Sequence, residues 1–161
     1  MGKADSGSRD PRRLERGSLF SFCLIGYDAG DMTRVAHTVL DSETGYACVI
    51  RAGRHQLTAD ESTAHGGTDT GPAPYQLLLS GLAACTAITL RMVAARKGWE
   101  LGSIHVDVEL HKDEGADRIV RAITLTAPLN DEQKATLADI AEKTPVTKTI
   151  KAGATIETKF L

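Results

Sequence analysis

A stretch of fourteen residues without a charge constrains this fold more than any other feature of the chain. It reads LLLSGLAACTAITL, from Leu77 to Leu90, and its only polar residues are Ser and Thr. Pro74 suits the first position of a helix and Gly98 suits its end, so the sequence predicts one helix of roughly 24 residues and about 36 Å. A surface helix would carry a polar stripe, and this one carries none. Because a 161-residue chain encloses so long a helix with difficulty, we expect a homodimer in which a second copy covers it.

The composition excludes several classes of protein. Hydrophobic residues make up 42 % and charged residues 25 %, which is typical of a globular chain. A net charge of −2 and 4 % aromatic residues argue against a nucleic-acid-binding surface. No run of 18 apolar residues is present, so no membrane span is expected. Three cysteines are too few, and odd in number, for a disulfide framework, which favours a reducing, cytoplasmic compartment.

The N-terminal part of the chain differs from the rest. Residues 1–18 are polar, rich in Gly, Ser and Arg, and predict a disordered tail. The short apolar stretch at 19–25 follows four arginines and weakly resembles a signal peptide, with an extra edge strand or a poorly packed extension as the alternatives. We therefore expect a polar extension over residues 1–31 and a single domain over residues 32–161.

The rest of the chain predicts an α+β fold, because hairpin patterns flank the long helix. A second helix is predicted after Asn130, whose side chain forms a capping-box pattern with Gln133, and Pro145 is expected to end that helix near Lys143. The expected order is β-β-β-α-β-β-α-β, with strands at residues 33–40, 46–50, 54–59, 103–111, 118–126 and 154–160.

Cys85 is the first candidate for chemistry. It lies in the middle of the charge-free stretch, and its small neighbours would let a ligand or a second backbone approach the sulfur. Burial as a small hydrophobic residue is the alternative interpretation. A reactive thiol needs a cation that stabilises the thiolate. Arg51 and Arg54 are the candidates, because a guanidinium stays charged.

Two other patterns do not match the sites that they suggest. The loop GGTDTGPAP has Pro72 and Ala73 where a phosphate-binding loop requires Lys and Ser or Thr. Four alternating polar residues on one predicted strand match no standard metal site, and a solvated strand face explains them: His105, Asp107, Glu109 and His111. We expect neither a metal nor a cofactor.

In combination these segments resemble a known family. The segment GGTDTGPAPYQLLLSGLAACTAITLRMVAARKGW is similar to the OsmC/Ohr family of osmotically inducible and organic-hydroperoxide-resistance proteins. The resemblance continues to TPVTKTI. It implies an intertwined homodimer with the two long helices at its core, and thiol-dependent reduction of organic hydroperoxides. In that chemistry Cys85 matches the peroxidatic cysteine, whose thiolate becomes a sulfenic acid.

The chain departs from this family at two positions. The family's second, resolving cysteine lies in a Cys-Pro-Val sequence, and Thr144 replaces it here. In the family a Glu normally follows the helix-starting Pro and pairs with a catalytic Arg. Tyr75 stands at that position here, and Glu61 is a candidate substitute for the Glu. The resemblance then implies a one-cysteine peroxidase whose sulfenic acid is resolved by an external thiol reductant. The alternative is a non-catalytic dimer of the same fold that binds a small apolar ligand near Cys85.

Overall fold

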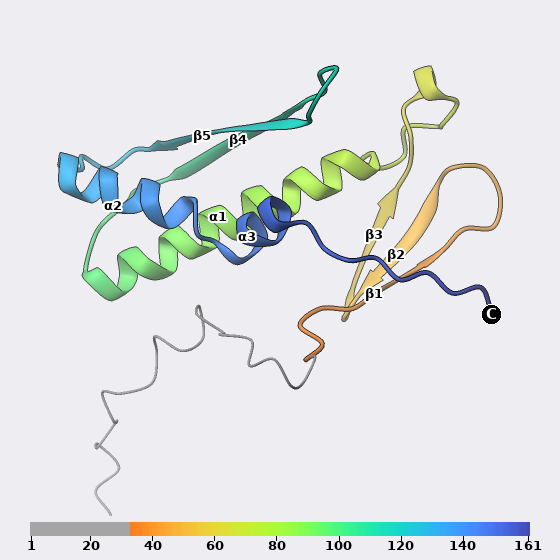
Figure 1. Cartoon of the computed structure of the whole chain (residues 1–161), viewed down its shortest axis with the longest axis horizontal. Coiled ribbons are helices and arrows are strands. Elements are labelled where there is room, and N and C mark those ends of the chain that lie inside the picture. The colour runs from red at the N-terminus through yellow and green to blue at the C-terminus, as the bar shows by residue number, and fades with distance from the viewer. Residues whose placement is uncertain (1–32) are drawn as a thin grey trace, which may run out of the picture. The chain divides into compact units, whose positions relative to one another are not determined.

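Helix α1, Pro74–Lys97, is the longest element of the computed structural model, which describes residues 33–161 (Figure 1). Its bounds confirm the sequence prediction at both ends. Pro74 occupies the first turn, where its missing N–H costs no hydrogen bond. Gly98 ends the helix in the left-handed conformation (φ +67°), and its N–H donates to the carbonyls of Ala94 and Ala95.

Three strands precede α1 and form an antiparallel sheet in the order β1-β2-β3 (Figure 1). They are β1 (Thr38–Asp41), β2 (Cys48–Ala52) and β3 (His55–Ala59). The three predicted strands are thus present, although the first begins at Thr38 rather than at residue 33. Most side chains of this sheet are exposed within one chain.

A long hairpin follows α1 and packs against it. Strands β4 (Ile104–His111) and β5 (Arg118–Leu125) pair antiparallel along their whole lengths. Their residues alternate between half-buried and exposed, as the sequence predicts for a sheet with one face on a core. The inward row on β5 is formed by residues 119, 121, 123 and 125, so it contains one charged residue, Arg121.

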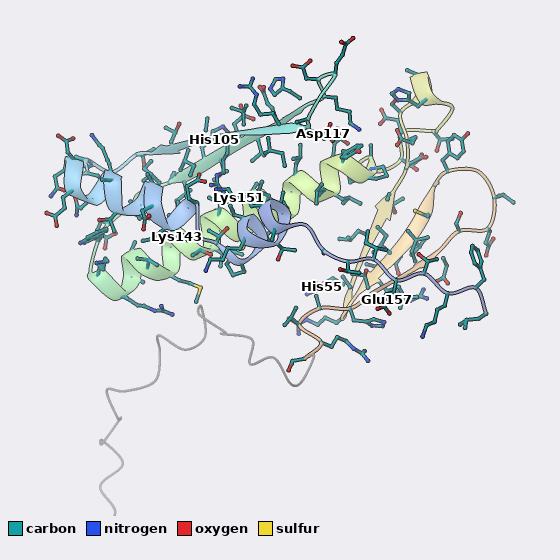
Figure 2. All side chains as sticks on the ribbon, in the orientation of Figure 1. His55, His105, Asp117, Lys143, Lys151 and Glu157 are labelled. Atoms are coloured by element: carbon teal, nitrogen blue, oxygen red, sulfur yellow. The ribbon has the colours of Figure 1, made fainter. Side chains whose placement is uncertain are left out.

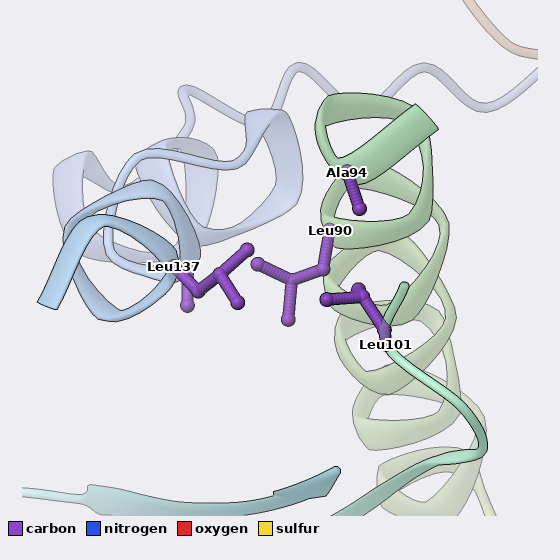
Figure 3. Packing of buried hydrophobic residues seen from close by; sticks show 5 residues of the cluster. Leu90, Ala94, Leu101 and Leu137 are labelled. Atoms are coloured by element: carbon purple, nitrogen blue, oxygen red, sulfur yellow. The ribbon is translucent and has the colours of Figure 1, made fainter. Parts of the chain in front are cut away.

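Helix α2, Asp131–Ala141, completes the hydrophobic core with α1. The predicted capping box is confirmed: the Gln133 N–H donates to Asn130 Oδ1 (2.8 Å), and the Asn130 N–H donates to Gln133 Oε1 (3.0 Å). Figure 3 shows how the cluster of buried residues brings α1, α2 and the segment before β4 together; it consists of Leu90, Ala94, Leu101, Leu137 and Ala141.

The structure corrects the prediction for the C-terminal region. Residues 145–152 form a further helix, α3 (Pro145–Ala152), where the sequence analysis expected only the end of α2. Thr144 is its N-cap and Pro145 its first residue, a pairing that starts helices. The strand predicted at residues 154–160 is absent, and this segment is fully exposed. A strand needs an edge to pair with, and within residues 33–161 this segment pairs with neither sheet.

Within residues 33–161, helix α1 is covered on one side only. Its buried residues face the core and α3: Leu82, Thr86, Thr89, Leu90 and Ala94. The opposite side carries Ile88 and Met92, which are 59 % and 43 % exposed. The predicted long central helix is therefore present, and within one chain it is half-buried rather than enclosed.

By length and composition α1 is a candidate membrane span, which the sequence analysis did not expect. Only 28 % of its most apolar 18-residue window is buried inside the described structure. However, β4, α2 and α3 all pack against this helix, and open sheet edges do not occur in hydrocarbon. The predicted extension over residues 1–31, including Cys23, lies outside the described residues.

Candidate functional site

Cys85 lies in the middle of α1, at the border between its covered and uncovered sides. Its thiol is free and half-buried. At about 100° per residue, Cys85, Ile88 and Met92 fall near the same side of the helix. Gly81 lies one turn earlier, and a Cβ built there would meet no atom within 4 Å. Space beside the sulfur is thus open toward the uncovered side, as a thiol that meets a ligand requires.

The predicted cation does not reach Cys85 within one chain. Arg51, on β2, pairs with Asp41 on the neighbouring strand β1, and both side chains are more than half exposed. Arg54 lies in the turn between β2 and β3 and is exposed. Among residues 33–161, no hydrogen bond or ion pair joins either arginine to the Cys85 thiol.

The loop before α1 is organised by a buried carboxylate that the sequence analysis did not single out. Asp60 is 2 % exposed. Its Oδ2 accepts from the hydroxyl and N–H of Thr68 (2.6 and 3.0 Å) and of Thr70 (2.9 and 3.1 Å). Its Oδ1 accepts from the Glu61 N–H (2.7 Å). These hydrogen bonds hold the pKa of Asp60 far below its usual range, and the bond from the Thr68 hydroxyl has the largest effect.

Two glycines let the same loop close on itself. A Cβ at Gly67 would lie 1.9 Å from the Glu61 carbonyl oxygen, and one at Gly71 would lie 2.5 Å from the Thr58 carbonyl oxygen. Neither contact is possible for a residue with a side chain. The Gly- and Thr-rich sequence of this loop therefore serves a tight fold around Asp60, and the loop delivers the chain into the first turn of α1.

Glu61 lines a cleft beside the N-terminal end of α1. The cleft has a volume of about 660 Å³, and nine residues line it: Tyr46, Glu61, Ser62, His65, Asp69, Gly71, Ala73, Tyr75 and Gln76. The Glu61 carboxylate lies 3.7 Å from His65 Nδ1, which is also 3.0 Å from Ser62 Oγ. Cys85 lies ten residues beyond Tyr75, about 15 Å along the helix, so one chain does not bring Glu61 and Cys85 together.

Tyr75, which the sequence resemblance places where the family usually has Glu, has a lysine partner. The Lys112 ammonium donates to the Tyr75 hydroxyl (2.9 Å) and lies 4.6 Å from the centre of its ring. The hydrogen bond to Tyr75, with Asp117 3.9 Å away, raises the pKa of Lys112. This chain thus has a tyrosine–lysine contact in the place where the resemblance implied a carboxylate–arginine pair.

Thr144, which the sequence resemblance aligns with the second cysteine, is buried in a network of hydroxyl groups. Its side chain is 1 % exposed, and its Oγ1 lies 2.7 Å from Thr147 Oγ1. The guanidinium of Arg121 donates to Thr147 Oγ1 (3.0 Å) and to Thr86 Oγ1 (2.8 Å). Thr86 directly follows Cys85 in the chain. Thr144 is therefore linked by hydrogen bonds to the helix turn that carries Cys85.

A cavity of about 420 Å³ lies next to this network. Its apolar walls come from Leu82, Ile119 and Ile150, and its polar lining consists of Asp117, Arg121, Glu142, Thr147 and Lys151. Figure 2 labels two of these residues: Asp117, directly before β5 in the turn that joins it to β4, and Lys151 on α3. Glu142 accepts from both Lys151 and Arg121, and these contacts, with Lys151 the larger cause, lower its pKa.

The four alternating polar residues of β4 point away from the core, and His111 Nε2 lies 2.8 Å from Glu109 Oε2 at the surface. Residues 33–161 contain no group of three or more His, Cys, Asp or Glu side chains placed to hold a metal ion.

Comparison with known proteins defines the class of this fold. Three solved structures are similar to it. The OhrB organic hydroperoxide resistance protein of Bacillus subtilis is 28 % identical (TM-score 0.52; 73 % of this chain and 91 % of the other covered). The Legionella pneumophila organic hydroperoxide resistance protein OsmC is 23 % identical (TM-score 0.54; 74 % and 92 %). An OsmC-like protein from Mycoplasma pneumoniae is 21 % identical (TM-score 0.60; 75 % and 89 %).

The sequence model of the OsmC-like protein family matches residues 67–159. This match spans more than half of the chain and includes α1, Cys85 and Thr144. The chain therefore belongs to the OsmC-like family, as its sequence motifs indicated. Comparison with curated protein sequences gave no match.

Proposed function

We propose that this protein reduces organic hydroperoxides through Cys85. The observation that carries the proposal is the position of this thiol: it is free, half-buried and beside open space at Gly81, on the central helix of a fold whose family includes organic hydroperoxide resistance proteins. The Cys85 thiolate attacks the distal peroxide oxygen and the O–O bond breaks. The products are Cys85 sulfenic acid and an alkoxide, which takes up a proton to become the alcohol.

An external thiol completes the cycle in this proposal. Thr144 offers no sulfur, so no internal bridge to the second-cysteine position can form. A thiol of the reductant attacks the sulfenic acid, which releases water and leaves a mixed disulfide on Cys85. A second reductant thiol then releases the Cys85 thiol. One hydroperoxide and two thiols thus give one alcohol, one disulfide and one water. Such a reductant matches the reducing, cytoplasmic compartment that we propose for the protein.

The active form in this proposal is a homodimer. The uncovered side of α1 carries Ile88 and Met92, which are 59 % and 43 % exposed, and the C-terminal tail carries Ile156 and Phe160, which are 86 % and 99 % exposed. Apolar surface of this extent is buried when a second copy packs against it. The tail alternates apolar and polar residues, a pattern that suits a strand added to a sheet of the second copy.

A second copy also supplies what one chain lacks at Cys85. In one chain Arg51 pairs with Asp41, and Glu61 lines a cleft at the far end of α1. We propose that the dimer brings Arg51 or Arg54 from the other copy to the thiolate, with Glu61 as the carboxylate that orients the guanidinium. The site is then complete only at the interface.

The alternative function is binding of a small apolar ligand without catalysis. One observation favours it: Thr144 takes part in a network of hydrogen bonds that no redox step needs. The neighbouring cavity of about 420 Å³ has an apolar wall of Leu82, Ile119 and Ile150, but the rest of its lining is polar or charged, so it would suit a ligand that also carries a polar group. A binding protein of this kind would keep Cys85 as a packing residue.

Trapping of the oxidised thiol separates the two functions. The protein is treated with one equivalent of cumene hydroperoxide in the presence of dimedone, and the modified cysteine is identified by mass spectrometry. The peroxidase proposal predicts a dimedone adduct on Cys85 and one equivalent of cumyl alcohol. An unmodified Cys85 with the hydroperoxide recovered intact would support ligand binding instead.

A further inference from the structure

Arg121 is the one charged residue in the inward row of β5, and it lies between Ile119 and Ile123. Its side chain is 9 % exposed. Burial of a guanidinium to this extent lowers the stability of the fold unless its N–H groups find hydrogen-bond acceptors. Because these N–H groups point in fixed directions, their bonds also fix the positions of the acceptor groups.

The two terminal nitrogens of Arg121 connect three helices. One donates to Thr86 Oγ1 on α1 (2.8 Å) and to Thr147 Oγ1 on α3 (3.0 Å). The other donates to the Ala141 carbonyl at the end of α2 (2.9 Å) and to Glu142 Oε1 (3.0 Å). Lysine has a single nitrogen and cannot reproduce this fork.

The hydroxyl groups around Arg121 use all their hydrogens. Thr86 donates to the Leu82 carbonyl (2.8 Å), and Thr147 donates to the Ala141 carbonyl (3.2 Å). The Thr144 hydroxyl oxygen lies 2.7 Å from Thr147 Oγ1. Thr147 and Thr86 both accept from Arg121, so a hydrogen-bonded network connects residue 144 with the turn of α1 that carries Cys85.

Helix α3 depends on contacts of this kind. It spans eight residues, Pro145–Ala152, and an isolated helix of that length is not stable in water. Its position must therefore come from tertiary contacts, and two polar ones involve Thr147: the bond that it accepts from Arg121 and the bond that it donates to the Ala141 carbonyl at the end of α2.

We propose that Arg121 is the positioning residue of this site: its fork holds α3, and with it residue 144, at a fixed place against the turn of α1 that carries Cys85. This inference rests on the proposed function where it concerns Cys85, because it assigns residue 144 to the second-cysteine position. The anchoring of α3 by Arg121 does not depend on peroxidase activity.

The first measurement is amide hydrogen exchange of α3, in Arg121→Lys, Arg121→Met and Thr147→Val. The matched control is Arg118→Met, since Arg118 is an exposed residue of the same strand. We expect exchange of the α3 amides to rise by about tenfold or more in the three test variants, with α2 and the control unchanged. Thr147→Ser keeps the hydroxyl and should behave as the wild type.

The second measurement uses Thr144→Cys in a Cys23→Ser/Cys48→Ser background. Oxidation should join the introduced thiol to Cys85, and adding Arg121→Lys should slow this bridge by about tenfold or more at each pH tested, because the fork and not the charge sets the distance.

The outcomes are distinct. Wild-type exchange in Arg121→Lys, or α3 exchange that no variant changes, would overturn the inference. If Arg121→Met does not fold, Thr147→Val against Thr147→Ser decides the question alone. If α3 exchange rises as expected but no bridge forms even with Arg121 present, Arg121 still anchors α3, and the alignment of residue 144 in the proposed function is what fails.

Discussion

Replacing Ile88 with lysine tests whether a second copy covers α1. Ile88 has the largest exposed fraction among the apolar residues of this helix, 59 %. Full burial of an isoleucine side chain is worth about 1.5–3 kcal/mol, so covering its exposed part contributes about 1–2 kcal/mol in each copy and about 2–4 kcal/mol in a symmetric dimer. Ile88→Lys removes this contribution and adds an ammonium that must be desolvated.

The expected result is a dimer dissociation constant raised by at least roughly 30-fold, since each 1.4 kcal/mol is a factor of ten. Sedimentation velocity over a concentration series measures it, and circular dichroism checks that the variant keeps its helix content. Val120→Lys is the matched control, because Val120 is 40 % exposed on the outward row of β5. A wild type that is monomeric at micromolar concentration, or an Ile88→Lys variant that dimerises as the wild type does, would refute the reasoning.

Three further predictions concern other parts of the molecule. Leu90→Ala removes a side chain that is 0 % exposed in the core and should lower the free energy of unfolding by about 3–5 kcal/mol, measured by urea denaturation. Asp60→Asn should destabilise the protein at neutral pH, because an amide NH₂ replaces an oxygen that accepts from Thr68 and Thr70. The pKa of Asp60 is lower in the folded state than in the unfolded state, where it is about 3.9. The contribution of its carboxylate to the free energy of unfolding is therefore present above that unfolded-state pKa and is lost as the pH falls toward the folded-state pKa. The difference in urea midpoint between wild type and Asp60→Asn should shrink from pH 7 to pH 2, and a constant difference would contradict this. Stoichiometric hydroperoxide should leave wild-type Cys85 as sulfenic acid and excess should drive it to sulfinic acid, whereas Thr144→Cys should protect it by forming a bridge, which peptide mass spectrometry detects.

Much of the fold could be predicted because the relevant signals are local. Pro74 and Gly98 set the two ends of α1 through backbone conformation alone, and both ends were predicted at the right residues. Asn130 and Gln133 form their capping box within one turn. The alternation along residues 104–111 and 118–125 was sufficient for the hairpin, since it reflects a single apolar face.

The errors arose where one residue has two possible roles. Pro145 ends a helix that precedes it and equally starts one that follows, and the sequence analysis considered only the first role. The Thr-Pro pair at 144–145 was the signal for α3. The strand predicted at 154–160 has the right alternation, but a strand forms only where a neighbouring edge is available, and that is not a local property.

The site was harder to predict because its polar contacts join distant segments. Arg121 could have been noticed as a charge in the inward row of β5, between Ile119 and Ile123, but its partners on α1 and α3 could not be read from spacing. Asp60 showed no signal beyond a Thr-rich loop. Arg51 and Glu61 were chosen by chemistry, and whether they meet Cys85 depends on a second copy of the chain.

Consumption of an organic hydroperoxide by the purified protein tests the central claim most directly. The assay follows loss of cumene hydroperoxide with a monothiol or a dithiol as reductant, for the wild type, Cys85→Ser and the control Cys48→Ser, whose half-buried thiol contacts the Ala59 carbonyl within the sheet. The account predicts that the wild type and Cys48→Ser consume many equivalents and form the alcohol, and that Cys85→Ser consumes none above the thiol alone. Equal consumption by Cys85→Ser and the wild type, or no turnover by the wild type with either reductant, would contradict it.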